Sequence, residues 1–134
     1  MRAQVVIIGA GPTDTLLEHL LHAAGIHVVI LERRSRAYVV ERIRAGVLEA
    51  GTVDVLRDAG LSSGLETHGA AHNGTLIAWG GRHAFMDVVE YTGREIVSYG
   101  QSPLQADLYA AADARGLVII DEAAQALELS CWLP

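Results

Sequence analysis

Residues 4–32, QVVIIGAGPTDTLLEHLLHAAGIHVVILE, decide the fold of this chain. An apolar run leads into Gly9-Ala10-Gly11, a helix-like stretch follows, and a second apolar run ends at Glu32. This order of strand, glycine turn, helix, strand and acid builds the βαβ unit that binds ADP-containing nucleotides. Gly9 allows the tight turn, Gly11 lets the backbone approach a pyrophosphate, and Glu32 is placed to bind ribose hydroxyls.

The third position of the glycine pattern is altered, because Asp14 stands where the fingerprint has glycine. Its charge lies beside the expected phosphate site, and two unit charges about 4 Å apart interact by roughly 4 kcal/mol at an effective dielectric of about 20. Asp14 or Thr13 is also suited to cap the following helix. The pattern therefore indicates the architecture but does not guarantee cofactor binding. An ordinary βα turn with two glycines is the alternative.

Composition limits the classes of function. The chain has 134 residues, 51% hydrophobic and 19% charged, with a net charge of −6, which fits one folded domain and argues against nucleic-acid or anionic-membrane partners. Cys131 is the single cysteine, so no internal disulfide can form and a cytoplasmic location is expected. The N-terminus is unlike a signal peptide, and no apolar run reaches the ~20 residues of a membrane span.

Strands and helices are expected to alternate along the chain. The expected order is a strand at about 4–8, a helix at 14–24, a strand at 27–31, a polar connection at 33–43, a helix at 44–59 broken near Gly51, a loop at 61–71, a hairpin turning at Gly80-Gly81 between 72–79 and 82–88, a strand at 96–99, a helix from Ser102-Pro103 to Gly116, and a strand at 117–120. The pattern over 122–129 does not decide between strand and helix.

The first of these helices has an expected apolar face, made of Leu16, Leu17, Leu20, Leu21 and Ala24. Together the elements predict an α/β fold, a Rossmann-type half-domain with an inserted β-hairpin. We expect residues 1–134 to form a single, partial and truncated FAD/NAD(P)-binding domain.

Several segments point beyond the general fold: QVVIIGAGP, LLHAAGI, VILERRS, RIRAGVLEAG, VDVLRDAGL and SYGQS. Over residues 3–120 the chain resembles the N-terminal part of the 4-hydroxybenzoate 3-monooxygenase family of class A FAD-dependent aromatic hydroxylases. The resemblance implies FAD as cofactor, NADPH as reductant and O₂-dependent hydroxylation of a phenol. It also implies that the later FAD motifs and the substrate sheet of the family are missing, so that an aromatic substrate binds only if that region is supplied and the chain alone is inactive.

The resemblance assigns roles to particular residues. It implies contacts with the cofactor from Gly9 and Gly11 at the pyrophosphate, Glu32 and Arg33 at the adenosine ribose, Arg42 and Arg44 in the segment that contacts FAD and helps to receive NADPH, and Gln101 on the flavin side. It also matches His72 to a histidine of a proton relay, although the partner of that relay belongs to the missing region.

Other readings remain open at this stage. His19 and His22 lie three residues apart, but no third ligand is apparent, so surface histidines are favoured over a metal site. Cys131 is expected to pack in the tail and not to act as a nucleophile. Besides part of an enzyme, the chain could be a non-catalytic nucleotide-binding module, or a vestigial interaction module that forms homo-oligomers through an exposed sheet edge.

Overall fold

The computed structural model describes residues 2–42 and 46–124. These residues form two compact units, the first built from both ends of the chain and the second from residues 45–100. The expectation of one partial domain over 1–134 stays a prediction. Within the described part of the chain, no helix is both long and apolar enough to span a bilayer.

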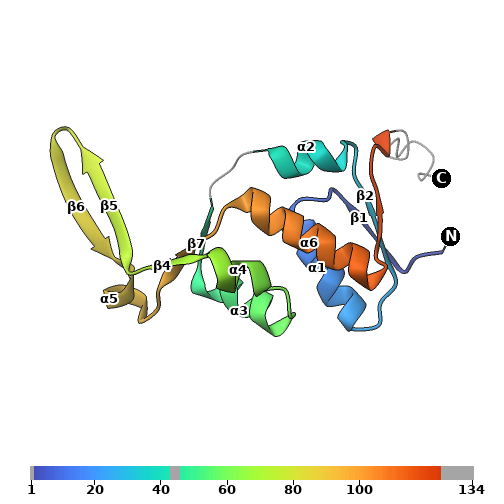
Figure 1. The fold of residues 1–134 in the computed structure, drawn as a ribbon, viewed down its shortest axis with the longest axis horizontal. Helices are drawn as coiled ribbons and strands as arrows, with labels where there is room; N and C mark the ends of the chain where they lie inside the picture. The colour runs from blue at the N-terminus through green and yellow to red at the C-terminus, as the bar shows by residue number, and fades with distance from the viewer. Residues whose placement is uncertain (1, 43–45, 125–134) are drawn as a thin grey trace, which may run out of the picture. The chain divides into compact units, whose positions relative to one another are not determined.

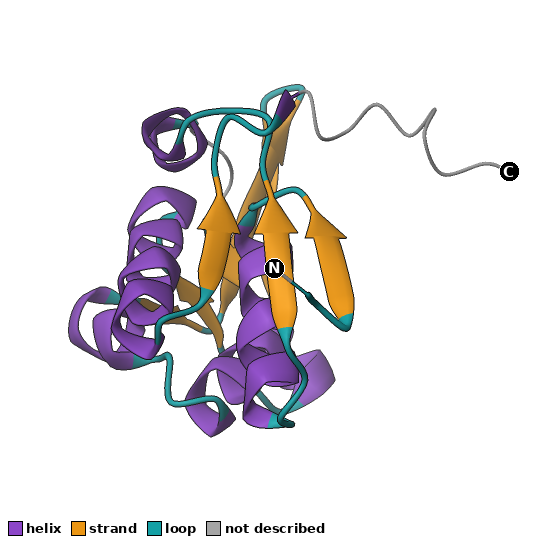
Figure 2. Cartoon of the chain, turned by 90° about the vertical axis from the view of Figure 1, so that its right-hand side faces the viewer, coloured by secondary structure: helices purple, strands orange, loops and turns teal. Residues whose placement is uncertain are grey.

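Among the described residues, the first unit contains a parallel sheet and three helices. Its elements are β1 (Val5–Ile8), α1 (Pro12–Ala23), β2 (Val28–Leu31), α2 (Arg36–Glu41), α6 (Gln101–Arg115) and β8 (Val118–Ile120), and Figure 1 shows α1 and α6 next to each other. The strand order is β1-β2-β8, and the three arrows point the same way in Figure 2. The expected α/β fold with a Rossmann-type βαβ unit is confirmed.

The two faces of this sheet differ in burial. Ile7 and Ile30 are partners in the register and are buried in a core that includes Ala10. On the opposite face Val6 and Ile8 are 54% and 56% exposed, since side chains alternate along a strand. One face of the sheet therefore packs into the core of the unit, while the other exposes Val6 and Ile8 but buries Val29, which is 5% exposed.

The buried face of α1 is polar, contrary to the expected leucine face. Thr15, Glu18 and His19 are almost fully buried, whereas Leu17 and Leu20 are 43% and 40% exposed. The buried residues share one helix face at i, i+3 and i+4 spacing, and α6 supplies hydrogen-bond partners for that face. A pattern of hydrophobic residues cannot identify such an interface, so the predicted leucine face was wrong for Leu17 and Leu20, although Leu21 packs against the core. The predicted surface position of His19 was wrong.

Three short helices were not expected, one of them α5 (Val88–Thr92), which follows the hairpin. Residues 33–43, predicted as a connection, contain α2, which begins after Ser35 because the Ser35 hydroxyl accepts a hydrogen bond from the Tyr38 N–H at 3.3 Å. Residues 61–71, predicted as a loop, contain α4 (Ser63–His68). Helices of six residues are too short to show a helical period in the sequence.

The second unit contains two antiparallel sheets. Its elements are β3 (Val47–Leu48), α3 (Ala50–Asp58), α4, β4 (Ala70–His72), β5 (Gly74–Trp79), β6 (Arg82–Asp87), α5 (Val88–Thr92) and β7 (Ile96–Ser98). One sheet has the order β3-β7-β4, and the other is the β5-β6 hairpin. The expected turn at Gly80-Gly81 is confirmed, with φ values of +50° and +77° that favour glycine. The expected helix over 44–59 was wrong at its start, where β3 pairs with β7.

Candidate functional site

The glycine turn between β1 and α1 is supported from below by buried side chains. Gly9 has a φ of +108°, which only glycine adopts readily. The Thr15 hydroxyl donates to the Gly11 carbonyl at 2.9 Å, and the Tyr109 hydroxyl donates to the Ala10 carbonyl at 3.1 Å. Burial raises the pKa of Tyr109 to about 12, so its hydroxyl keeps the proton that it donates. Helices α1 and α6 thus hold the turn in place.

Asp14 folds back into this turn. Its Oδ2 accepts a hydrogen bond from the Gly11 N–H at 3.0 Å, and a Cβ on Gly9 would lie 3.0 Å from the same oxygen. The helix cap is therefore Gly11, with Asp14 three positions later reaching back to it, and not Asp14 or Thr13 as expected. The carboxylate occupies a donor that a phosphate would use.

Glu32 lies at the carboxyl end of β2 and is 8% exposed. Its Oε2 accepts from the Ala10 N–H at 2.9 Å, and its Oε1 accepts from the Arg34 N–H at 2.8 Å. An ionised carboxylate has about four acceptor sites, so both oxygens can also accept from hydroxyl groups. Glu32 is therefore held in one orientation and keeps acceptor sites for hydroxyl groups.

A cavity of about 230 Å³ opens beside the turn, and all its lining residues belong to the first unit. It is lined by Gly9, Gly11, Pro12, Asp14, Glu32, Arg33, Arg34, Tyr38, Val39, Arg42 and Gln101. Six of the seven residues that the sequence assigns to the cofactor are among them, and the seventh, Arg44, lies outside the described residues. The cavity is smaller than the about 300–1,000 Å³ of a site for a whole drug-sized ligand, so it suits one part of a dinucleotide.

The lining also includes Arg34, to which the resemblance gave no role. Arg34 lies over the ring of Tyr38, 5.2 Å from its centroid, which holds a second arginine next to Arg33 at the cavity. With Arg42, three guanidinium groups face two carboxylates around the cavity, those of Asp14 and Glu32. The arginines fit an anionic ligand, and the residues fit FAD except at Asp14.

Arg36, two residues after Arg34, is not among the residues that line the cavity. It pairs with Asp113 at 2.7 Å, reaches Asp121 at 3.6 Å, and lies 4.6 Å from the centroid of the Tyr109 ring. Burial raises the pKa of Asp121, which Arg36 partly offsets. Arg36 therefore joins α2 to α6 and β8 beneath the site.

The polar interface between α1 and α6 contains two buried ionisable groups. The His19 Nε2 bonds the Leu108 carbonyl at 3.0 Å, Arg115 contacts its Nδ1 at 3.1 Å, and burial lowers the pKa of the imidazole. Burial raises the pKa of Glu18 to about 7, and neither carboxylate oxygen has a hydrogen-bond partner within the described part of the chain. Across residues 2–42 and 46–124, no three potential metal ligands come together.

His72, the candidate for a proton relay, belongs to the second unit. Its Nε2 lies 2.7 Å from the Ser98 hydroxyl across the β4-β7 pairing. Sequence reasoning missed Ser98, although the SYGQS segment contains it. The role of His72 stays a prediction.

Comparisons with known proteins agree with this geometry. The family model "FAD binding domain" matches residues 2–130. The p-hydroxybenzoate hydroxylase of Acinetobacter baylyi is 42% identical over 118 residues, which cover 87% of this chain and 29% of that enzyme. The chain thus spans less than a third of the length of this relative.

Solved structures show the same fold. The p-nitrophenol 4-monooxygenase of Pseudomonas putida DLL-E4 matches 88% of this chain and 31% of its own, with a TM-score of 0.74 and 22% identity. The anhydrotetracycline hydroxylase OxyS of Streptomyces rimosus matches 91% of this chain and 25% of its own, with a TM-score of 0.72 and 25% identity.

Proposed function

The chain belongs to the FAD binding domain family, and from this premise we propose that it is the ADP-binding, N-terminal portion of a flavin-dependent aromatic hydroxylase. The observation that supports this most is the cavity at the glycine turn. Gly9, Gly11, Glu32, Arg42 and Gln101 come from four separate places in the sequence and line it together. We expect 4-hydroxybenzoate as the substrate and NADPH as the reductant, because the Acinetobacter relative is a p-hydroxybenzoate hydroxylase.

Each residue has a distinct task in holding the cofactor. The turn at Gly9 and Gly11 presents its backbone to the pyrophosphate, although the Asp14 carboxylate already accepts from the Gly11 N–H. Glu32 accepts hydrogen bonds from the ribose hydroxyls, and Arg42 holds a phosphate oxygen through its planar guanidinium. We assign Gln101, at the start of α6, to the flavin side. When bound, FAD supplies the electron transfer and oxygen chemistry of hydroxylation.

Asp14 sets the strength of this binding. The pyrophosphate must displace its carboxylate from the Gly11 N–H, or bind beside it at a cost in electrostatic repulsion. We therefore propose that FAD binds weakly. Hydroxylation would also need the further chain length that the Acinetobacter relative has, so no hydroxylase activity is expected from these 134 residues alone.

A non-catalytic nucleotide-binding module is the second candidate. The small volume of the cavity favours it, because about 230 Å³ suits an ADP moiety better than the whole of FAD. Under this proposal ADP and FAD bind equally well, and Gln101 contributes nothing.

Calorimetric titration with FAD and with ADP tests both proposals. Arg42→Ala should weaken binding of both ligands about tenfold or more, as expected for the loss of a charged hydrogen bond. Arg57→Ala, which removes an exposed arginine of the second unit, should leave the binding of both ligands unchanged. Tighter binding of FAD than of ADP supports the hydroxylase portion, and equal binding supports the module. If neither ligand binds to the chain or to an Asp14→Gly variant, both proposals are wrong.

A further inference from the structure

The peptide between Ala10 and Gly11 faces the cavity on one side and α6 on the other. It is trans and planar, so its carbonyl and its N–H point in opposite directions. The Ala10 carbonyl accepts from the Tyr109 hydroxyl of α6 at 3.1 Å, and the Gly11 N–H donates to the Asp14 carboxylate at the cavity. A group that fixes this carbonyl therefore also fixes the direction of the N–H that a phosphate would use.

This peptide has to be held in place, because Gly11 has no Cβ. Glycine adopts positive and negative φ values about equally well, so a peptide beside it can rotate at little cost. Gly11 has a φ of −70°, and Asp14 holds its N–H. A phosphate that displaces the Asp14 carboxylate breaks that bond, so the orientation of the peptide then depends on what holds the Ala10 carbonyl.

Two buried hydroxyl groups hold the carbonyl side of the turn. Thr15 is 0% exposed, and its hydroxyl lies 3.3 Å from the Ala10 carbonyl and 2.9 Å from the Gly11 carbonyl. Gln105 of α6 donates from its Nε2 to the Thr15 hydroxyl oxygen at 3.2 Å. A hydroxyl has a single hydrogen, and since Gln105 occupies its acceptor side, that hydrogen points toward the turn.

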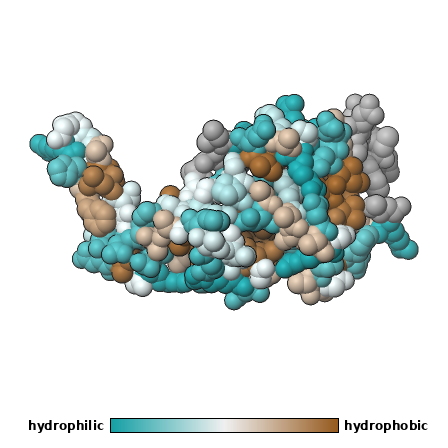
Figure 3. Space-filling view, in the orientation of Figure 1, coloured by the Kyte–Doolittle hydropathy of each residue, from teal (hydrophilic) through white to brown (hydrophobic). Residues whose placement is uncertain are grey.

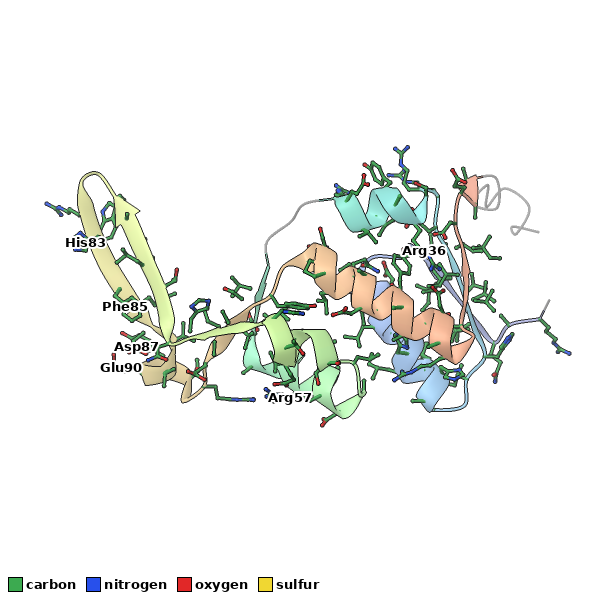
Figure 4. All side chains as sticks on the ribbon, in the orientation of Figure 1. Arg36, Arg57, His83, Phe85, Asp87 and Glu90 are labelled. Carbon is green, nitrogen blue, oxygen red and sulfur yellow. The ribbon has the colours of Figure 1, made fainter. Side chains whose placement is uncertain are left out.

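The second hydroxyl belongs to Tyr109, whose ring is packed on both of its surroundings. The ring belongs to the core cluster that contains Ala10 and Ile30. The Arg36 guanidinium lies 4.6 Å from the ring centroid, and Figure 4 shows Arg36 between the ribbons of α2 and α6. A ring that is packed in this way keeps its hydroxyl at the Ala10 carbonyl.

We propose that Thr15, Gln105 and Tyr109 are positioning residues for the nucleotide phosphates, because they fix the Ala10–Gly11 peptide with its N–H toward the cavity. This inference rests on the proposed nucleotide-binding function, and it adds three residues that are not among those lining the cavity. They raise the affinity for a phosphate without touching it. A role in packing alone would need side chains of this shape, but it would not need the hydroxyl groups.

Paired substitutions separate positioning from packing. Thr15→Val removes the hydroxyl and keeps the shape, whereas Thr15→Ser keeps the hydroxyl and loses a methyl group. Titration with ADP, followed by NMR, should show about fivefold weaker binding for Thr15→Val, the affinity equivalent of one neutral hydrogen bond, and unchanged binding for Thr15→Ser. Tyr109→Phe keeps the ring and should weaken ADP binding to a similar extent. Leu108→Val, at a buried side chain of α6 outside the network, is the packing control and should leave ADP affinity unchanged.

Amide exchange in the ligand-free chain tests the orientation of the peptide without a nucleotide. The Gly11 N–H should exchange with water faster in Thr15→Val and in Tyr109→Phe, because a rotated peptide loses its bond to Asp14. The Gly25 N–H, which donates to the His22 carbonyl just after α1, reports any general loosening of that helix and should be unchanged.

The two measurements separate this proposal from the proposed function. Equal ADP affinity of the natural chain, Thr15→Val and Tyr109→Phe, or equal losses in Thr15→Ser and Thr15→Val, overturns the positioning role and leaves the nucleotide site in place. Unchanged Gly11 exchange in both variants that lack a hydroxyl overturns it as well, and Tyr109→Phe decides alone if Thr15→Val does not fold. If ADP binds neither the natural chain nor Asp14→Gly, the proposed function is wrong and the positioning role falls with it.

Discussion

Replacing Asp14 by asparagine should tighten the binding of ADP and FAD. The Asp14 Oδ2 lies 3.0 Å from the Gly11 nitrogen, so a phosphate oxygen on the same N–H comes within about 4 Å of the carboxylate. At an effective dielectric of about 20 this repulsion is about 4 kcal/mol, and solvent and salt at an open cavity reduce it to roughly 1–2 kcal/mol. Since 1.4 kcal/mol is tenfold in affinity, binding should tighten by about 5- to 30-fold.

Asparagine is the informative replacement because it removes the charge and keeps an oxygen for the Gly11 N–H. Glycine would also remove the side chain that reaches back to the start of α1, with a loss of about 1 kcal/mol in stability. Isothermal titration with ADP at low and high salt measures the effect, and the gain should shrink at high salt. Asp58→Asn, an equal charge change on the exposed end of α3, is the control.

The reasoning about Asp14 fails under two results. An unchanged dissociation constant for Asp14→Asn would show that the phosphates do not approach the Gly11 N–H. A gain as large for Asp58→Asn would show that the effect is one of net charge and not of this turn.

Three further predictions concern stability. The folded-state pKa of Glu18 is about 7, against an ordinary 4.5, so its protonated carboxyl stabilises the fold fully below pH 4.5. As the pH rises toward 7, the free energy of unfolding should fall by up to about 3 kcal/mol. Glu18→Gln should remove this fall, as urea midpoints measured across that pH range would show. Tyr109→Phe removes the hydrogen bond to Ala10 and should lower the unfolding free energy by about 1 kcal/mol, with no loss expected if the hydroxyl is free. In Gly46→Ala the new Cβ would lie 2.7–2.9 Å from backbone atoms, so the variant should destabilise the fold by about 1–3 kcal/mol. In Gly51→Ala, within α3, the new Cβ has no atom nearby, so the variant should stabilise the fold by about 0.5–1 kcal/mol. Thermal melts that rank the two variants the other way would contradict this.

The sequence predicted the nucleotide-binding unit well because its signals are local. Strand, turn and helix between Val5 and Leu31 follow from apolar runs and glycines, and the hairpin follows from Gly80-Gly81. Gln101 is far from the turn in sequence, and only the resemblance connected it to the same cavity.

The remaining features depend on tertiary contacts that no single segment contains. The burial of His19 depends on carbonyl and guanidinium groups of α6, about ninety residues away, so periodicity pointed to the wrong face of α1. The position of Asp14 is local, but a negative charge in a phosphate-binding turn suggested two outcomes, a cap or a repelling group. The structure shows the carboxylate bonded back to Gly11, which combines both.

The exposed apolar side chains of the folded chain, some of which are brown in Figure 3, have a consequence for how unfolding is measured. Val6 and Ile8 stay more than half exposed in the folded chain, and so do several side chains of the hairpin, among them Leu76 and Phe85. The dependence of unfolding free energy on urea, and the heat capacity of unfolding, both scale with the surface that unfolding newly exposes. This chain should therefore show shallow, broad transitions for its length. A broad transition would reflect how little apolar surface the native state hides, and is not by itself a sign of several native populations.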